Sequence, residues 1–300
     1  MAGKEATRDA YGRALVRLGA THPQMVVLDA DLSKSTKTAD FGKTYPERFI
    51  RLGVAEQNLM GTAAGLALAG KIPFASSFAV FATGRAFEQI RNSIAYPCLN
   101  VRIAATHAGI SVGEDGGSHQ SIEDVALMRV LPHMTVVVPA DARETDKVIE
   151  ASLAWEGPMY IRMGRLAVSP VYEEDYAFTI GRAVELRDGT GATIIANGLM
   201  VQEALQAASL LEAEGIAVRV LNMHTVKPLD EAAIIRAAKE TGAIVTAEEH
   251  SIIGGLGSAV AEVLVEQAPV PMLRVGLKDC FGESGAPREL MEKYGLTASH

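Results

Sequence analysis

Residues 106–124 read THAGISVGEDGGSHQSIED and follow an apolar run of strand length, Val101 to Ala105. Four glycines let this backbone take left-handed turns and approach a ligand closely. Two histidines and two neighbouring carboxylates supply groups that can move protons near neutral pH. In open α/β sheets, ligands bind at irregular segments that follow the carboxyl ends of buried strands, so the stretch predicts a functional site. Ser121, with Asp124 three residues later, predicts a helix that opens at Ser121.

A metal centre is the alternative interpretation of the same loop. Its four candidate ligands are His107, His119, Glu114 and Asp115. Twelve residues separate the two histidines, and neither an HExxH motif nor a cysteine accompanies them, so the metal signal is weak. Proton-transfer chemistry is the favoured interpretation, and we expect no metal ligands in this chain.

Composition restricts the class of protein. The chain has 300 residues, 48% of them hydrophobic, which is enough for one or two domains with buried cores. With 28 basic and 36 acidic residues the net charge is −8, and no cluster of Lys and Arg favours a nucleic-acid partner. Cys98 and Cys280 stand in neither a CxxC nor a zinc spacing, so a reducing compartment without disulfides is expected.

The N-terminus carries charges where a signal peptide needs its apolar core. No apolar run approaches the ~18 residues that span a bilayer. These features predict a cytoplasmic protein without a membrane partner.

Apolar patterning predicts an α/β fold with two domains of mainly parallel sheets. We place the domains at residues 1–165 and 189–300, joined by a linker at 166–188 where periodicity fails. The expected strands are 25–28, 101–105, 135–138, 158–162, 192–196, 217–221, 243–246 and 272–275. The expected helices are 7–18, capped by Thr7; 62–69, apolar enough to be buried; and 141–154, 201–214, 230–239 and 257–267.

Two further local patterns have ordinary explanations. Glu56 stands at the head of the apolar helix, where a carboxylate stabilises the helix dipole. Gly254, Gly255 and Gly257 precede a helix, but they lack the spacing and strand context of a phosphate loop, so a tight packing turn is expected.

The whole string 106–124 closely resembles the substrate-channel loop of transketolases. GVAEQNLMG at 53–61 resembles the glutamate motif of thiamine-diphosphate enzymes, and the FxxF…RAFxQIR pattern at 78–91 resembles the transketolase segment that walls the coenzyme's aminopyrimidine. VKPLD at 226–230 and AEEHSIIGGLG at 247–257 resemble the C-terminal domain that transketolases share with keto-acid dehydrogenases. The resemblance implies a pyrimidine-binding domain followed by a transketolase C-terminal domain.

The resemblance also implies a coenzyme site. Glu56 would contact the pyrimidine ring and share a proton with it, while Phe81, and secondarily Phe78, would stack on the ring. In an ADLxxS segment, Asp31 would lie near the coenzyme. The sequence departs from the resemblance at one wall of the pocket, where Gly84 stands in place of the tyrosine that some transketolases carry.

The same resemblance implies a sugar-phosphate site. Arg8, Ser35 and Arg165 would meet the phosphate, and Asp115 would recognise a sugar hydroxyl. His107 and His119 would bind the sugar and assist proton transfers. The implied reaction moves a two-carbon ketol unit from a ketose phosphate to an aldose phosphate, as in the pentose phosphate pathway.

Thiamine enzymes of this class hold the diphosphate through a metal on a GDG motif, and no GDG occurs in this sequence. The chain therefore resembles the C-terminal subunit of a split transketolase. An N-terminal subunit with GDG…N would hold Mg²⁺ or Ca²⁺ and complete the thiamine diphosphate site, with a homodimer of this chain at the core of an α2β2 heterotetramer. The alternatives are a deoxyxylulose-phosphate synthase, a keto-acid dehydrogenase β subunit, and a non-catalytic half that regulates another protein.

Overall fold

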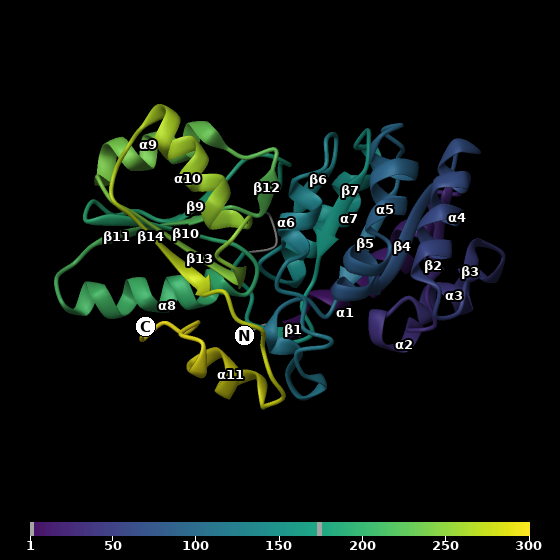
Figure 1. The fold of residues 1–300 in the computed structure, drawn as a ribbon, viewed down its shortest axis with the longest axis horizontal. Helices are drawn as coiled ribbons and strands as arrows, with labels where there is room; N and C mark the ends of the chain where they lie inside the picture. Colours follow the sequence, from purple (N-terminus) through teal and green to yellow (C-terminus); the bar gives the residue numbers. More distant parts are fainter. Residues whose placement is uncertain (1–2, 173–175) are drawn as a thin grey trace.

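Two β-sheets organise the chain, one in each half of the molecule (Figure 1). The computed structural model describes residues 3–172 and 176–300. Both sheets are mainly parallel and carry helices on both faces, which confirms the predicted α/β class. Among the described residues, no helix is long and apolar enough to cross a membrane.

The first sheet has seven strands in the order β12-β6-β7-β5-β4-β2-β3, and only β12 runs antiparallel to its neighbour. Its strands are β2 Met25–Asp29, β3 Phe49–Arg51, β4 Ile72–Phe78, β5 Arg102–Thr106, β6 Thr135–Val137, β7 Met159–Arg162 and β12 Thr225–Lys227. The helices of this half are α1 Thr7–Gly19, α2 Ser33–Thr36, α3 Ala39–Thr44, α4 Glu56–Leu68, α5 Phe87–Gln89, α6 Asp124–Arg129 and α7 Ala142–Ala154.

Successive residues of the central strands pack into two separate hydrophobic cores, because side chains alternate between the two faces of a sheet. Val27 packs with α1 and α7 on one face, whereas Leu28 packs with α4 and α6 on the other. β2, β5 and β7 are buried at every position, as expected of strands covered by helices on both faces.

The second sheet has the order β14-β13-β10-β11-β9, with only β9 antiparallel. Its strands are β9 Val184–Arg187, β10 Ala192–Ala196, β11 Val218–Asn222, β13 Ile244–Ser251 and β14 Met272–Leu277. Its helices are α8 Met200–Ala213, α9 Glu231–Thr241, α10 Leu256–Gln267 and α11 Pro287–Lys293. The four strands and three helices expected in this half all form, while β9, β12 and α11 were not expected.

The segment 166–188, expected to be a linker, carries strands of its own. β8 Ala167–Val168 pairs with β1 Glu5–Ala6, and β9 joins the second sheet. Strand β12, which belongs to the C-terminal half, pairs with β6 of the first sheet. Residues 173–175 of the expected linker lie outside the described residues, and the domain boundaries 1–165, 166–188 and 189–300 remain a prediction.

Two expected helix caps are wrong. The helix expected to open at Ser121 begins at Asp124, and α1 has Ala6 rather than Thr7 at its cap position. The Thr7 hydroxyl instead accepts a hydrogen bond from the Gly164 N–H at 2.9 Å. Asp124, the second residue of the expected capping box, instead has tertiary partners in Tyr160 and Arg162, as Thr7 has in Gly164.

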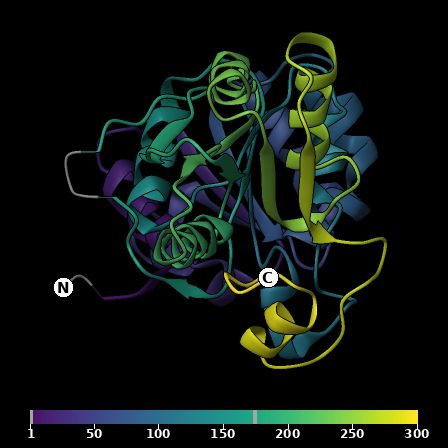
Figure 2. The ribbon, with the colours of Figure 1, turned by 90° about the vertical axis from the view of Figure 1, so that its left-hand side faces the viewer.

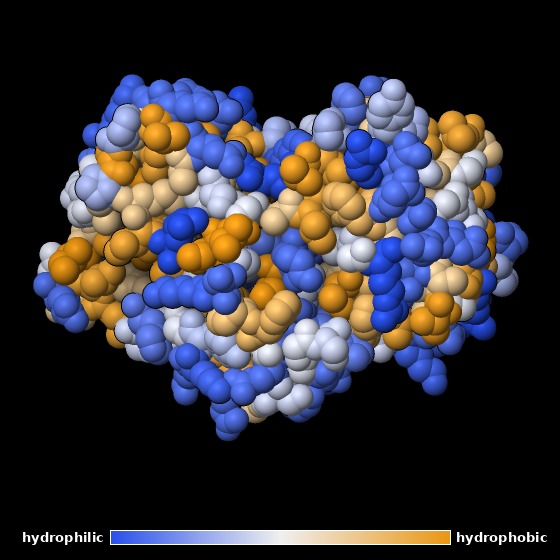
Figure 3. All heavy atoms as spheres, viewed as in Figure 1, coloured by the Kyte–Doolittle hydropathy of each residue, from blue (hydrophilic) through white to orange (hydrophobic). Residues whose placement is uncertain are grey.

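The expectation that the apolar helix is buried is also wrong for one face of α4. Leu68 is 75% exposed, and Val54, just before the helix, is 73% exposed. Figure 3 shows hydrophobic surface over the end of the molecule that α4 forms. Composition predicted burial, but only one face of the helix meets the sheet of its own chain.

A buried ion pair joins distant segments of the first half. Arg162, the last residue of β7, donates from Nε to Asp124 Oδ2 at 2.7 Å. Tyr160 donates to the same oxygen at 2.5 Å. Burial opposes the charge on Asp124, yet the Arg162 guanidinium outweighs it and holds the pKa of that carboxyl below its usual value.

We expect Asp124→Ala to lower the free energy of unfolding by about 3–5 kcal/mol, because it leaves the Arg162 charge buried without a partner. Adding Arg162→Met should recover part of the loss. Urea denaturation measures both effects. Asp40→Ala, which removes an exposed pair with Lys43, is the control. A loss from Asp124→Ala no larger than that of the control would contradict the prediction.

Candidate functional site

The loop after β5 lies where the carboxyl ends of the first sheet gather. Phe78 ends β4 opposite Thr106, which ends β5. His107 follows at φ +57°, and a 3-10 turn, Ile110–Asp115, lies between Gly109 at φ +82° and Gly116 at φ +77°. A non-glycine residue held in the left-handed region is costly and typical of functional sites.

His107 is buried between an aromatic ring and a cation. Arg8 Nη1 lies 2.9 Å from Nε2 of the imidazole, and Thr106 Oγ1 lies 2.8 Å from Nδ1. Because a guanidinium can only donate, Nε2 accepts and the proton resides on Nδ1. Burial, followed by the Arg8 charge, lowers the pKa of His107 to about 3, so the ring is neutral.

Arg8 connects this histidine to the loop after β2, since its Nη1 also donates to the Ser35 carbonyl at 3.2 Å. Arg165 donates to the Val112 carbonyl at 2.7 Å and approaches Asp115 Oδ2 at 3.4 Å. Arg8 and Arg165 both contribute positive charge at His107. The structure thus brings four predicted substrate residues together around His107.

Asp31 is exposed at φ +66° and is not what shapes the loop after β2. The buried Asp29, which the sequence analysis missed, accepts hydrogen bonds from the Leu32 N–H and from the Thr36 and Thr38 hydroxyls. Burial raises the pKa of its carboxyl despite these bonds. Asp29 is the last residue of β2, and a polar residue at the end of a buried strand could have been recognised in the sequence as a candidate site residue.

Three aromatic rings continue the site from His107. The His107 ring stacks on Phe78 at 3.8 Å, and Phe78 stacks on Phe81 with centroids 5.9 Å apart. His119 meets Phe81 edge-on at 5.2 Å, and its Nδ1 lies 3.0 Å from Ser118 Oγ. The predicted stacking residues and both histidines therefore share one aromatic wall.

Glu56 closes the far end of this wall. Its side chain is 5% exposed, and Arg85 Nη1 donates to Oε1 at 3.3 Å. The Arg85 guanidinium lies 4.1 Å from the Phe81 ring centroid. The sequence analysis missed Arg85, although the residue stands within the RAFxQIR pattern that drew attention to this segment.

The C-terminal half holds the loop between β5 and α6, residues 107–123, in place; we call this segment the central loop. Glu249, in β13, accepts a hydrogen bond from the Ser111 N–H at 2.6 Å. Gly109 permits this approach, because a Cβ there would lie 2.2 Å from the Glu249 carboxyl carbon. Gln120 donates to the Glu283 carbonyl at 2.9 Å. Figure 2 shows α11 beside the loop, where Pro287 packs against Gly113.

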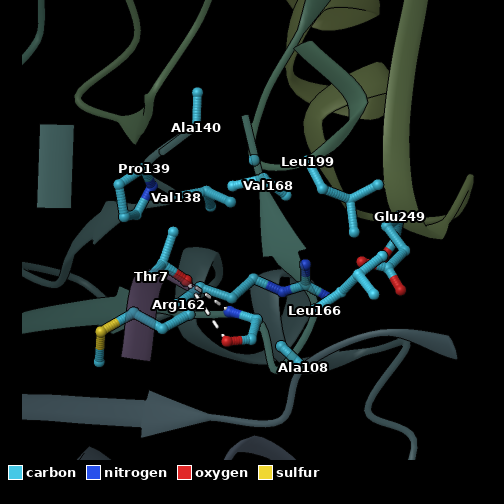
Figure 4. A pocket seen from close by; sticks show the side chains of 13 residues that line it. Thr7, Ala108, Val138, Pro139, Ala140, Arg162, Leu166, Val168, Leu199 and Glu249 are labelled. Carbon is cyan, nitrogen blue, oxygen red and sulfur yellow. Dashed lines mark hydrogen bonds between the residues drawn. The ribbon is translucent and has the colours of Figure 1, made fainter. Parts of the chain in front are cut away.

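A small cavity of about 20 Å³, room for about one water, lies between the two halves (Figure 4). Figure 4 shows Arg162 crossing below Leu199, with Glu249 at its end and Thr7 on the opposite side. Burial raises the pKa of Glu249 to about 7, despite the nearby Arg162 charge. The sequence analysis did not single out Glu249 within the segment 247–257, because its partner Ser111 is 138 residues away.

The metal alternative finds no support in the geometry. Within residues 3–172 and 176–300, no three His, Cys, Asp or Glu side chains gather as a ligand set. Glu114 and Asp115 face Arg165, and His107 faces Arg8.

The glycine turn before α10 is a packing turn, as predicted. The backbone N–H groups of Leu256 and Gly257 donate to the Glu248 carboxylate, both at 2.7 Å. A Cβ on Gly255 would lie 2.0 Å from the same carboxylate. The helix terminus already holds an anion from its own chain, so it is not a phosphate site.

Comparison with known proteins identifies the family. Residues 4–170 match the transketolase pyrimidine binding domain, and residues 181–300 match the transketolase C-terminal domain. The chain belongs to the transketolase family. Its resemblance to the C-terminal subunit of a split transketolase is confirmed by relatives of the same kind.

A transketolase C-terminal section from Methanocaldococcus jannaschii is 52% identical over 96% of this chain and 92% of its own length. A 6-deoxy-6-sulfo-D-fructose transketolase subunit from Clostridium is 48% identical over 97% of this chain and 90% of its own. A solved structure described as a split gene transketolase, inactive beta4 tetramer, is 59% identical, with TM-score 0.91 over 99% of this chain and 95% of that one. The transketolase of Rattus norvegicus is 39% identical over 98% of this chain, which spans only 47% of the rat protein.

Replacing Glu249 by Gln should remove a pH-dependent contribution to stability. The folded pKa of about 7 exceeds the usual value of 4.5, so the folded protein binds a proton that the unfolded chain releases between these values. This stabilisation is present below about pH 4.5 and is lost as the pH rises through 7. As the pH rises, the free energy of unfolding of the wild type should fall by up to about 3 kcal/mol relative to that of Glu249→Gln, at ~1.4 kcal/mol per pKa unit.

Urea denaturation of both proteins between pH 5 and 8 measures the difference. Glutamine keeps an acceptor for the Ser111 N–H but has no proton to release. If the two stability curves run parallel across this range, Glu249 is not the titrating group.

Proposed function

We propose that this chain is the pyrimidine-binding and C-terminal subunit of a thiamine-diphosphate-dependent transketolase, which moves a two-carbon ketol unit from a ketose phosphate to an aldose phosphate. A separate subunit with the diphosphate-binding domain completes the enzyme. One observation carries the proposal, a continuous line of side-chain contacts that joins the predicted phosphate end to the predicted coenzyme end. The line runs through Arg8, His107, Phe78, Phe81, Arg85 and Glu56.

The coenzyme end suits the aminopyrimidine part of thiamine diphosphate. Phe81 offers a ring face for a flat heteroaromatic partner, and the nearly buried Glu56 carboxylate can meet a ring nitrogen. The guanidinium of Arg85, a planar group with N–H donors, already meets both residues. Asp31 is placed near the coenzyme by resemblance alone.

We find no ligand set for the metal of the diphosphate in residues 3–172 and 176–300. The sequence has no GDG, and the described residues contain no metal-ligating set. The chain also spans under half of the rat transketolase. A partner subunit therefore holds the Mg²⁺ or Ca²⁺ and the diphosphate, in an α2β2 arrangement built on a homodimer of this chain.

When bound, thiamine diphosphate supplies a carbon nucleophile and an electron sink for breaking the bond beside a carbonyl. Glu56 holds a proton at the pyrimidine nitrogen. Arg8 and Arg165, with Ser35, bind the anionic end of the sugar, because a guanidinium matches an oxyanion in charge and geometry. Asp115, released from Arg165, binds a sugar hydroxyl.

The two histidines have different tasks. His119 moves protons on substrate hydroxyls from its place at the edge of Phe81. His107 is neutral, and its Nε2 accepts from Arg8, so it orients that arginine until substrate arrives and then binds a hydroxyl of the sugar. A neutral imidazole near the charges of Arg8 and Arg165 avoids a third positive charge.

We expect the isolated chain to bind thiamine diphosphate weakly and to have no transketolase activity. A solved relative that is 59% identical is described as an inactive tetramer of one type of subunit. Calorimetry with coenzyme and Mg²⁺, first on the chain and then on its mixture with a GDG-bearing subunit, is the test. Tight binding by the chain alone would overturn the split arrangement.

Substrate assays on the mixture separate the remaining functions. Turnover of ketose and aldose phosphates supports the proposal, whereas turnover of pyruvate would favour a deoxyxylulose-phosphate synthase. A sulfonated ketose is included because one relative is named for that substrate.

We expect Glu56→Gln to keep the fold but lower turnover about 10²–10⁴-fold at saturating coenzyme, the range typical of a lost proton-transfer group. The substitution preserves shape and removes the proton-sharing carboxylate. Glu88→Gln, an exposed change on α5, is the control. If both variants turn over sugar phosphates at the wild-type rate, Glu56 is not the activating acid.

A further inference from the structure

Arg85 makes both contacts that the proposed function assigns to the coenzyme ring. Its guanidinium stacks over Phe81 at 4.1 Å and donates to Glu56 at 3.3 Å. A guanidinium is planar and carries N–H donors in its plane, so it presents a flat face to the ring and donors to the carboxylate. An aminopyrimidine presents the same two features.

The local backbone directs Arg85 to this place. Phe81–Arg85 forms one turn of π-helix, which places the first and last residues of the turn on one side. The Thr83 hydroxyl donates to the Ala79 carbonyl at 2.8 Å, and Gln57, next to Glu56, donates to the Arg85 carbonyl at 3.2 Å. The backbone of Arg85 is thus fixed to α4, whereas its side chain is 53% exposed and can move away.

We infer that Arg85 occupies the binding position of the coenzyme's aminopyrimidine ring in the free subunit, and that its guanidinium must leave this position before the ring can enter. The inference rests on the proposed function. It makes Arg85 a positioning residue that keeps the Glu56 carboxylate paired while the coenzyme ring is absent. Coenzyme binding then exchanges one planar donor for another.

Replacing Arg85 by Met tests the exchange, because methionine keeps apolar contact with Phe81 but has no charge or donor. In the complex with the partner subunit, Arg85→Met should bind thiamine diphosphate about 3- to 30-fold more tightly, since a half-exposed ion pair and a cation–π contact no longer compete. Calorimetry with Mg²⁺ measures the dissociation constant. Arg91→Met, an exposed arginine on the following turn, should leave it unchanged.

A second measurement examines the free chain without coenzyme. The Phe81 ring current should shift the side-chain proton resonances of Arg85, and Phe81→Leu should abolish that shift in the NMR spectrum. Absence of the shift in the wild type would overturn the inference, because the guanidinium would not be on the ring.

The outcomes separate the inference from the proposed function. If the wild-type complex binds coenzyme and Arg85→Met binds it equally or more weakly, the inference is wrong and the proposed function stands. If the wild-type complex binds no coenzyme, both are wrong. Tighter binding by Arg85→Met, with Arg91→Met unchanged, supports both.

Discussion

The buried guanidinium of Arg162 constrains the rest of the structure. A charge without water must have its hydrogen bonds satisfied, and Arg162 finds its acceptors on three separate segments. It donates to Asp124 at the start of α6, to the Ser121 carbonyl at the end of the loop, and to the Glu249 carbonyl in β13. The end of β7, the central loop and the C-terminal half are therefore held in one arrangement.

This arrangement gives the C-terminal half a role at the site, although it contributes none of the predicted site residues. Glu249 fixes the loop backbone at Ser111, and the segment before α11 holds Gln120. The glycines of the loop let another backbone or carboxylate approach, as Gly109 does for Glu249. In the sequence these glycines looked like groups that would approach a ligand. In the structure several of them approach the protein itself.

Charge is distributed unevenly along the line of contacts. Burial and the charges of Arg8 and Arg165 keep His107 neutral, while Arg165 also faces the carboxylates of Glu114 and Asp115. At the other end the Glu56 carboxylate is paired with Arg85. Aromatic rings separate the two ends, so an anionic sugar and a coenzyme ring would each meet a distinct environment. This separation is consistent with one surface that orients a substrate against a coenzyme.

The sequence by itself determined the α/β class, most strands and helices, and the family, because hydrophobic runs and continuous motifs are local properties of the chain. The same continuous motifs predict Glu56, Phe78, Phe81, His107 and His119 as site residues. Only the tertiary structure decided that Asp124 pairs with Arg162 rather than capping a helix, that Glu249 holds the loop, that Arg85 pairs with Glu56, and that one face of α4 is exposed. The hydrogen-bonding partners of these residues lie 38, 138 and 29 positions away in the sequence. No local pattern records such pairings, because packing and the need to satisfy buried charge select them only after the chain has folded.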